Sequence, residues 1–178
     1  MRASLAACLL AVVFAGGCAA TPEEAALPRE YLDTATAATV TVGVPSLVFA
    51  RDRTEYAVHA RDYLTLVAVD VNRAGQHAQY FFGYAWSTIG KPSAPAQSTQ
   101  PSRFELVADG RRIPLVHQPG PLRELGLGEA PLPPPSRTAE LLVAPASREV
   151  QEFVQRASEL HAVLVGDGGS ARYELWSR

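Results

Sequence analysis

The side chains best suited to acid–base chemistry and to metal binding are scattered along this sequence. Its histidines are His59, His77, His117 and His161. None lies within four residues of another, so the short spacings of zinc ligands, such as H-x-x-x-H, do not occur. The G-x-S-x-G motif of many hydrolases is also missing, and no segment groups Ser, His and Asp. We therefore expect no metal, no cofactor and no catalytic residues; a hydrolase whose residues only the fold brings together is the least favoured alternative.

One acidic residue stands out because of its neighbours. Asp70 lies between Val69 and Val71 in an apolar segment. Burial in such a segment would raise the pKa of the carboxyl group and make it a candidate catalytic acid or base. A carboxylate near a strand end, paired with one of the many arginines, explains the same pattern. We favour the second interpretation.

A glycine-rich segment near the end of the chain matches a nucleotide-binding pattern formally. Residues 166–171, Gly-Asp-Gly-Gly-Ser-Ala, fit the dinucleotide fingerprint G-x-G-x-x-A. That fingerprint requires a following helix, whose N-terminus binds the pyrophosphate. Only seven residues follow Ala171, and their pattern is that of a strand. We therefore predict a hairpin turn here rather than a cofactor site.

Four aromatic side chains alternate along one predicted strand and would share one face of it. They are Tyr80, Phe82, Tyr84 and Trp86. If exposed, such a face is a platform for sugars or apolar groups, because large exposed aromatic patches are rare without a function. The opposite face, with Gly83, Ala85 and Ser87, offers little to bury. We therefore predict that the aromatic face is core, and keep the ligand platform as the alternative.

The N-terminus has the layout of a secretory signal peptide. Arg2 precedes an apolar run at residues 5–14, and the small residues 15–17, Ala-Gly-Gly, lead to Cys18. The junction resembles the lipobox of bacterial lipoproteins, although Ala15 stands where that family usually has Leu. The resemblance implies cleavage before Cys18 and acylation of its thiol. Since Ala19 rather than Asp follows the cysteine, it also implies an outer-membrane anchor with the domain facing the periplasm.

Other readings of this segment are less favoured. The apolar run with its small residues, 5–17, is shorter than the roughly 20 residues of a spanning helix. An ordinary signal peptide cut after Gly17 or Ala20 remains an alternative. On the lipoprotein reading, residues 1–17 are the signal peptide, 18–37 a lipidated flexible tether and 38–178 a single β-rich domain.

Composition narrows the classes of partner. Loss of Arg2 with the signal peptide changes the formal charge from −2 to −3, so no electrostatic case exists for nucleic acid. Cys8 lies in the signal peptide and Cys18 is the lipidation site, so the mature domain has no disulfide. The expected partners are the membrane, through acyl chains on Cys18, and another envelope protein.

Strand-like patterns fill most of the domain. Alternation and turn signals predict strands at residues 39–42, 46–50, 55–59, 63–73, 79–89, 103–108, 113–116, 138–144, 160–165 and 173–176. The segment 74–77 predicts a hairpin loop, and Asp109-Gly110 predicts another. Pro114 lacks a ladder donor, which places its strand at a sheet edge. The Pro-rich segment 117–137 is a long loop, whose leucines at 122, 125 and 127 should pack against the domain.

One helix is predicted, at residues 147–158. Ser147 is a suitable N-cap. Val150, Phe153, Val154 and Ala157 recur at helical spacing and form an apolar stripe that must lie on a sheet.

These elements predict a mainly β fold. We expect an antiparallel two-layer β-sandwich with one C-terminal helix packed on it; a single antiparallel sheet covered by the helix is the alternative. The expected function is a non-catalytic binding or scaffolding module of the bacterial envelope. The alternative is a small-ligand or glycan binder that uses the aromatic face.

Overall fold

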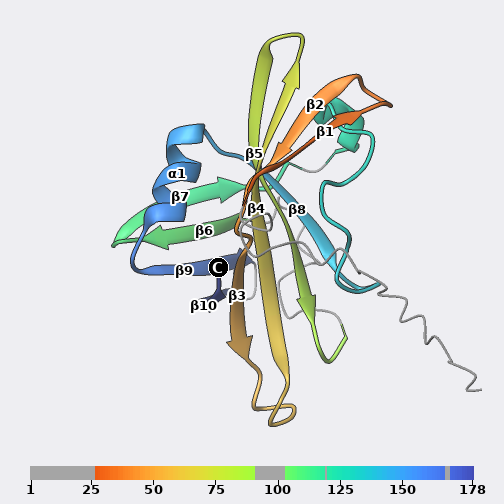
Figure 1. Cartoon of the computed structure of the whole chain (residues 1–178). Coiled ribbons are helices and arrows are strands. Elements are labelled where there is room, and N and C mark those ends of the chain that lie inside the picture. Colours follow the sequence, from red (N-terminus) through yellow and green to blue (C-terminus); the bar gives the residue numbers. More distant parts are fainter. Residues whose placement is uncertain (1–26, 91–102, 119, 167–168) are drawn as a thin grey trace, which may run out of the picture.

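The domain is built almost entirely of antiparallel strands (Figure 1). The computed structural model describes residues 27–90, 103–118, 120–166 and 169–178. Its elements are β1 (Arg29–Asp33), β2 (Ala38–Val42), β3 (Leu47–Asp52), β4 (Arg61–Arg73), β5 (Gln76–Ser87), β6 (Arg103–Ala108), β7 (Arg111–Val116), the 3-10 helix η2 (Leu122–Leu125), β8 (Glu140–Pro145), α1 (Arg148–Arg156), β9 (Leu160–Gly166) and β10 (Gly169–Ser177).

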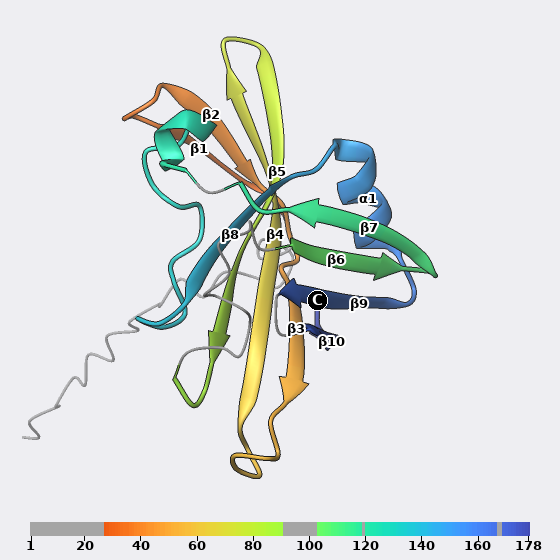
Figure 2. The ribbon, with the colours of Figure 1, turned by 180° about the vertical axis from the view of Figure 1, so that it is seen from behind.

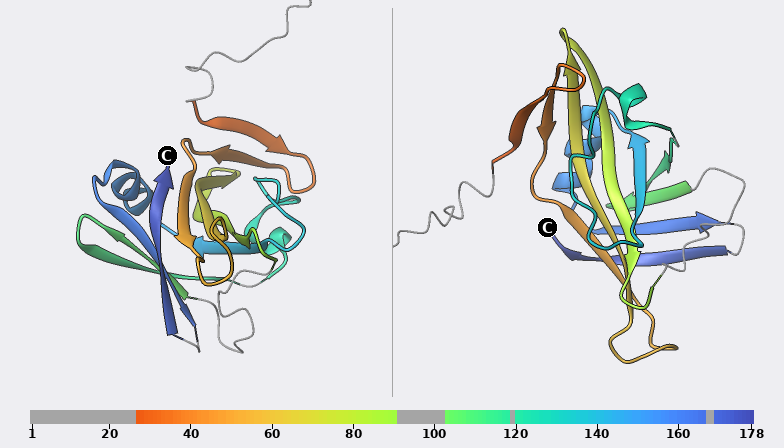
Figure 3. Two further views of the ribbon diagram at one scale, coloured as in Figure 1. Left: turned by 90° about the horizontal axis from the view of Figure 1, so that it is seen from below. Right: turned by 90° about the vertical axis from the view of Figure 1, so that its right-hand side faces the viewer.

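Within the described residues, all ten strands belong to one strongly curled sheet. Its order is β1-β2-β4-β3-β10-β9-β6-β7, with β5 on the other side of β4 and β8 beyond β5. β6, β7 and β9 cross the direction of β4 and β5 steeply, and the curl is clear from below (Figures 1 and 3). The mainly β, antiparallel prediction is confirmed. Two separate layers are not confirmed, because the long β4 pairs with β2, β3 and β5 and joins all parts into one sheet.

The two ends of the curled sheet approach each other at β8. Val143 of β8 donates its backbone N–H to Nδ1 of His117, just after β7, over 3.0 Å. The N–H of Gln118 donates to the carbonyl of Val143 over 2.8 Å. The described residues of β7 and β8 form no ladder with each other, and Pro114 accordingly lies in an edge strand, as predicted.

The centre of the sheet is the β4–β5 hairpin, which the sequence predicted. Its register runs from Asp62 opposite Ser87 to Arg73 opposite Gln76. The turn is Ala74-Gly75, and both residues have positive φ, as a two-residue turn between twisted strands requires. Further down the hairpin, a Cβ at Gly83 would lie 2.0 Å from the carbonyl oxygen of Thr65, so only glycine fits there.

The buried face of this hairpin changes side halfway along it. In the lower half of β4, Leu64 and Leu66 point into the curl; in the upper half, Val69 and Val71 are buried on the opposite face. The first core, inside the curl, includes Phe49, Leu64, Leu66, Phe81, Phe104, Leu106, Leu142, Val154, Ala162 and Tyr173. The second core, on the other face, includes Val40, Val67, Val69, Val71, Phe82, Leu127 and Val143.

The segment after β7 covers the second core. Leu127 is fully buried there, and Leu122, Leu125 and Leu132 pack against it, which confirms that the leucines of this long loop pack down. η2 lies beside β1 and β2 in both the front and the rear view (Figures 1 and 2). A carboxylate fixes the loop to β1, since Asp33 Oδ2 accepts from the N–H of Gly128 over 2.5 Å.

Two sequence-based expectations differ from the structure. The range 18–37, expected to be a tether, contains β1 (Arg29–Asp33), which pairs with β2; as an edge strand it buries little, so it shows no apolar periodicity. The strand expected at 55–59 is a turn-rich loop between β3 and β4. Its Tyr56 and Val58 are exposed and pair with no strand, and an ion pair between Arg53 and Asp62 holds the base of the loop.

Helix α1 closes one side of the first core. Ser147 caps it by accepting a hydrogen bond from the N–H of Val150, as predicted. Val154 and Ala157 are buried in the first core, and Val150 and Phe153 pack against it, so the predicted apolar stripe is confirmed. The described part of the chain contains no helix of the length and apolarity needed to cross a membrane.

Candidate functional site

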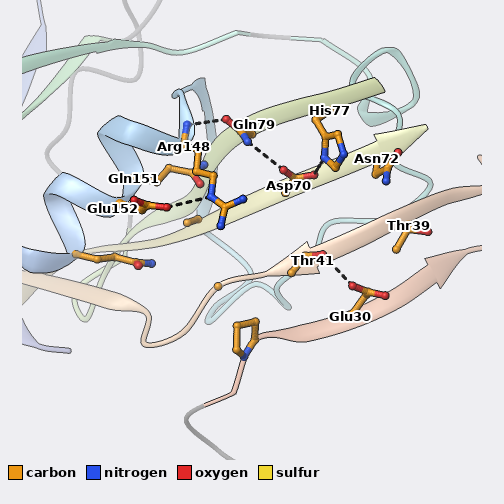
Figure 4. A pocket seen from close by; sticks show the side chains of 14 residues that line it. Glu30, Thr39, Thr41, Asp70, Asn72, His77, Gln79, Arg148, Gln151 and Glu152 are labelled. Atoms are coloured by element: carbon orange, nitrogen blue, oxygen red, sulfur yellow. Dashed lines mark hydrogen bonds and ion pairs between the residues drawn. The ribbon is translucent and has the colours of Figure 1, made fainter. Parts of the chain in front are cut away.

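A polar groove of about 380 Å³ lies where α1 meets the upper half of the sheet (Figure 4). The face of β4 and β5 that lines the first core continues upward past Ala68, but there it is no longer covered by other strands. The side chains on this uncovered part of the face are polar. They form the floor of the groove, and α1 forms its wall.

Two cross-strand rows make up the floor. In the first, Glu30 of β1 is opposite Thr41 of β2, Thr41 is opposite Asp70 of β4, and Asp70 is opposite Gln79 of β5. In the second, Thr39, Asn72 and His77 are neighbours in the same way. Since directly opposite residues in antiparallel strands share a face, the register alone brings these seven polar side chains together.

The wall comes from one polar stripe of α1. Arg148, Gln151, Glu152 and Gln155 line the groove. Their spacing, i, i+3, i+4 and i+7, places them on one helix face, beside the apolar stripe that enters the first core. Gln151 is buried and its Nε2 donates to the carbonyl of Tyr80 over 2.8 Å, which ties the wall to β5.

A chain of hydrogen bonds joins floor and wall (Figure 4). Nδ1 of His77 lies 2.8 Å from Oδ1 of Asp70, and Gln79 Nε2 donates to Oδ2 of Asp70 over 3.1 Å. The Oε1 atom of Gln79 in turn accepts from the backbone N–H of Arg148 over 2.6 Å. That N–H belongs to the first turn of α1, where helices leave their donors unsatisfied. The chain therefore fixes the start of the helix to the sheet.

Asp70 thus has a different role from the one predicted. It is partly exposed rather than buried, and its partners are a histidine and a glutamine instead of an arginine. A histidine whose Nδ1 faces a carboxylate resembles the base of a hydrolytic triad. In the described residues, however, no hydroxyl or thiol is hydrogen-bonded to His77, so the pair lacks a positioned nucleophile.

The other histidines lie apart from the groove. His59 is in the exposed β3–β4 loop, and His117 bonds to Val143. His161 is on β9, where burial and, secondarily, the charge of Arg172 lower its pKa. Among the described residues, no group of three His, Cys, Asp or Glu side chains could hold a metal ion.

The aromatic face is buried at its centre, as predicted, and half-buried at Tyr80 and Trp86, its two ends. Phe82 and Tyr84 are buried, and Tyr80 meets Phe82 edge-on with ring centroids 5.9 Å apart. Burial raises the pKa of Tyr80 and of Tyr84, and the Tyr84 hydroxyl donates to the carbonyl of Leu132. Trp86 stacks on Tyr63 at 4.4 Å. The four rings therefore do not form an exposed platform.

The expectation that the opposite face of β5 buries little is wrong. Phe81 lies on that face and is buried in the first core together with Ala85. The strand is covered on both sides at this point, because the curl encloses one face and the 122–132 segment covers the other.

Of the remaining sequence motifs, the glycine-rich segment belongs to the predicted hairpin, and the N-terminal motif lies outside the described residues. Gly166 pairs with Gly169 in a β9–β10 hairpin, and a strand rather than a helix follows, as predicted. The predicted signal peptide and the predicted lipidation site Cys18 fall in the part of the chain that the structure does not describe.

Sequence reasoning missed the groove, although two signals pointed to it. Polar residues recur at i, i+3, i+4 and i+7 in α1, and the apolar face of β4 turns polar at Asp70. Family models, curated proteins and solved structures were all compared with this chain, and none of them matches it.

Proposed function

We propose that this chain is a lipid-anchored, non-catalytic module of a bacterial envelope that faces the periplasm and binds another envelope component in the polar groove. The anchor is the acylated Cys18 implied by the lipobox resemblance, and the favoured location is the outer membrane. The groove is the observation that carries the binding role. Burial of the aromatic strand face removes the support for a platform there.

The lining of the groove supports binding rather than reaction. Five elements (β1, β2, β4, β5 and α1) contribute hydrogen-bonding side chains to one concave surface. Arg148 pairs with Glu152 over 3.0 Å, and both oxygens of Asp70 accept hydrogen bonds. Side chains held by one another in this way present a preformed surface, which lowers the entropic cost of ligand binding.

The anchor is tested by changing the cysteine. In Cys18→Ser we expect an uncleaved precursor or protein released to the soluble fraction, because more than one acyl chain is needed for stable anchoring. Fractionation and mass spectrometry measure both results. An unmodified Cys18 in the mature wild-type protein would contradict the anchor.

The groove is tested by photo-crosslinking in intact cells. A photoreactive residue at position 152, in the groove wall, should capture an envelope component under ultraviolet light. Position 149 is the matched control, since Glu149 is also exposed on α1 but does not line the groove. Equal capture at both positions, or none at either, would show that the groove is not the binding site.

A further inference from the structure

Each charged side chain that lines the groove already has an ion-pair or hydrogen-bond partner. Arg148 lies 3.0 Å from Glu152, which also lies 3.8 Å from Arg156. Asp70 accepts from His77 and Gln79, and Glu30 accepts from the hydroxyl of Thr41 over 3.5 Å. An anion in the groove would have to displace Glu152 from Arg148, the one arginine of the described lining. The carboxylates of Glu30 and Asp70 accept from a hydroxyl, a carboxamide and an imidazole, and they can accept further hydrogen bonds from ligand hydroxyls.

The groove is also poorly suited to an apolar ligand. Small-ligand sites of about 300–1,000 Å³ are usually lined by apolar and aromatic side chains. This groove falls in that size range, yet its apolar lining consists only of Pro28, Gly43 and Ala68. About half of its surface is polar, and this half is formed by hydroxyl, carboxamide, imidazole, carboxylate and guanidinium groups.

Several of these groups can both donate and accept a hydrogen bond. Threonine hydroxyls and glutamine carboxamides have this double capacity, and so do the hydroxyls of a sugar. Within the described part of the chain, the Thr39 hydroxyl and the Gln155 carboxamide have no hydrogen-bond partner. Thr39 lies in the second row of the floor and Gln155 lies in the wall formed by α1. A ligand in the groove could therefore bond to both the floor and the wall.

A strip of small residues separates the polar floor from the helix. Gly43 donates its N–H to the carbonyl of Ala68 over 2.7 Å, so the two residues lie side by side on neighbouring strands. A Cβ at Gly43 would lie 3.4 Å from Nε2 of Gln155. The Gln155 carboxamide therefore lies against this strip, next to the polar floor.

We propose that the groove binds a neutral, hydroxyl-rich ligand, that is, a carbohydrate. The inference rests on the proposed function for the location of the site, and it adds the chemical class of the occupant. Ring hydroxyls bond to Thr39, Thr41 and Gln155, while the Asp70 chain holds the floor in place. The ligand is selected by its pattern of hydroxyls and not by its charge.

The test is calorimetric titration of the lipid-free domain, residues 19–178, preceded by a circular-dichroism check that it is folded. The probes are neutral oligosaccharides (maltotriose and N,N′,N″-triacetylchitotriose), spermidine and inorganic phosphate, with a neutral-glycan array as a wider screen. We expect binding of a neutral glycan and none of spermidine or phosphate. The double variant Thr39→Val/Thr41→Val should weaken glycan binding about tenfold or more, since two hydroxyls are lost while the β-branched shape is kept.

The control variant is Thr65→Val, which makes the same change on β4 outside the groove and should leave the affinity unchanged. Binding of spermidine or phosphate alone, or of none of the probes and array glycans, would overturn the carbohydrate assignment. So would equal affinities of the double variant and the wild type. If position 152 then still captures a protein in cells, the groove remains a binding site and only its ligand class has failed.

Discussion

Two aspartates on the same face of β4 have opposite environments. Asp62 is fully buried at the lower end of the first core and pairs with Arg53 over 2.7 Å. Asp70 lies on the same face beyond Leu64, Leu66 and Ala68, and it forms the floor of an open groove. Strand alternation is identical for the two residues. What differs is the cover: the curled sheet closes over Asp62, and no strand closes over Asp70.

Burial also affects the polar atoms of Asp62 and of the nearby Tyr173. The hydroxyl of Tyr173 and Oδ1 of Asp62 are buried and lack a hydrogen-bond partner among the described residues. Burial and the nearby carboxylate raise the pKa of Tyr173 to about 12. Near Asp70, in contrast, the polar groups are exposed enough to bond to water or to a ligand. The first cluster is therefore closed to solvent, whereas the second is open to it.

The largest effect is expected at the buried aspartate. Asp62→Ala removes one partner of a desolvated ion pair, so the free energy of unfolding should fall by about 3–5 kcal/mol. Urea denaturation measures the loss. Asp52→Ala is the control, because Asp52 pairs with Arg61 at an exposed site and such pairs contribute ~1 kcal/mol or less. Similar losses for both variants would mean that burial does not distinguish these two ion pairs.

The second-largest loss of stability is expected in the segment that covers the second core. Leu127→Ala empties a fully buried site where the 122–132 segment packs on the upper half of the hairpin. We expect a loss of about 2–4 kcal/mol in the free energy of unfolding. Hydrogen exchange should also speed up at Val69 and Val71, which lie beneath this leucine. An unchanged exchange rate would contradict the role of the segment as a cover.

Asp33 binds the segment that covers the second core, so the stability of this region should depend on pH. Hydrogen bonds from the N–H groups of Gly128, Ala35 and Thr36 hold the pKa of Asp33 below its usual value of 3.8. Its contribution is therefore complete above the pKa of the unfolded chain and is lost as the pH falls through the folded-state pKa. Denaturation of wild type and Asp33→Asn between pH 6 and pH 2 measures it. The stability difference between the two proteins should shrink toward the acid end; a constant difference would contradict the prediction.

The smallest effect on stability is expected at the groove. Asp70→Asn keeps an acceptor for Gln79 and lies at a partly exposed site, so the free energy of unfolding should change by about 0.5 kcal/mol or less. Thermal denaturation beside Asp62→Asn gives the direct contrast. A loss as large as that of Asp62→Asn would mean that Asp70 supports the fold rather than a ligand.

Local signals in the sequence predicted most of the secondary structure. Ser147 and the stripe from Val150 to Ala157 predicted α1, and Asp109-Gly110 predicted the β6–β7 turn. These features depend on neighbouring residues. The curl of the sheet and the change of buried face in β4 depend on pairing between distant strands, such as β3 with β10, which no local pattern reveals. The groove was missed for the same reason. Glu30 and Asp70 come together only through the pairing of β1, β2 and β4, and Gln155 joins them only because α1 packs beside that sheet.

The pairing of β3 with β10 also constrains when the domain can form. Residues 48–50 meet residues 174–177, so the curl cannot close until nearly the whole domain is available. Until then, a chain emerging from its N-terminus exposes the apolar residues of β3 and β4 that will become the first core. Contacts so distant in sequence slow folding and leave sticky surface uncovered for longer. A nascent chain of this kind would therefore depend on holding chaperones until β10 is in place.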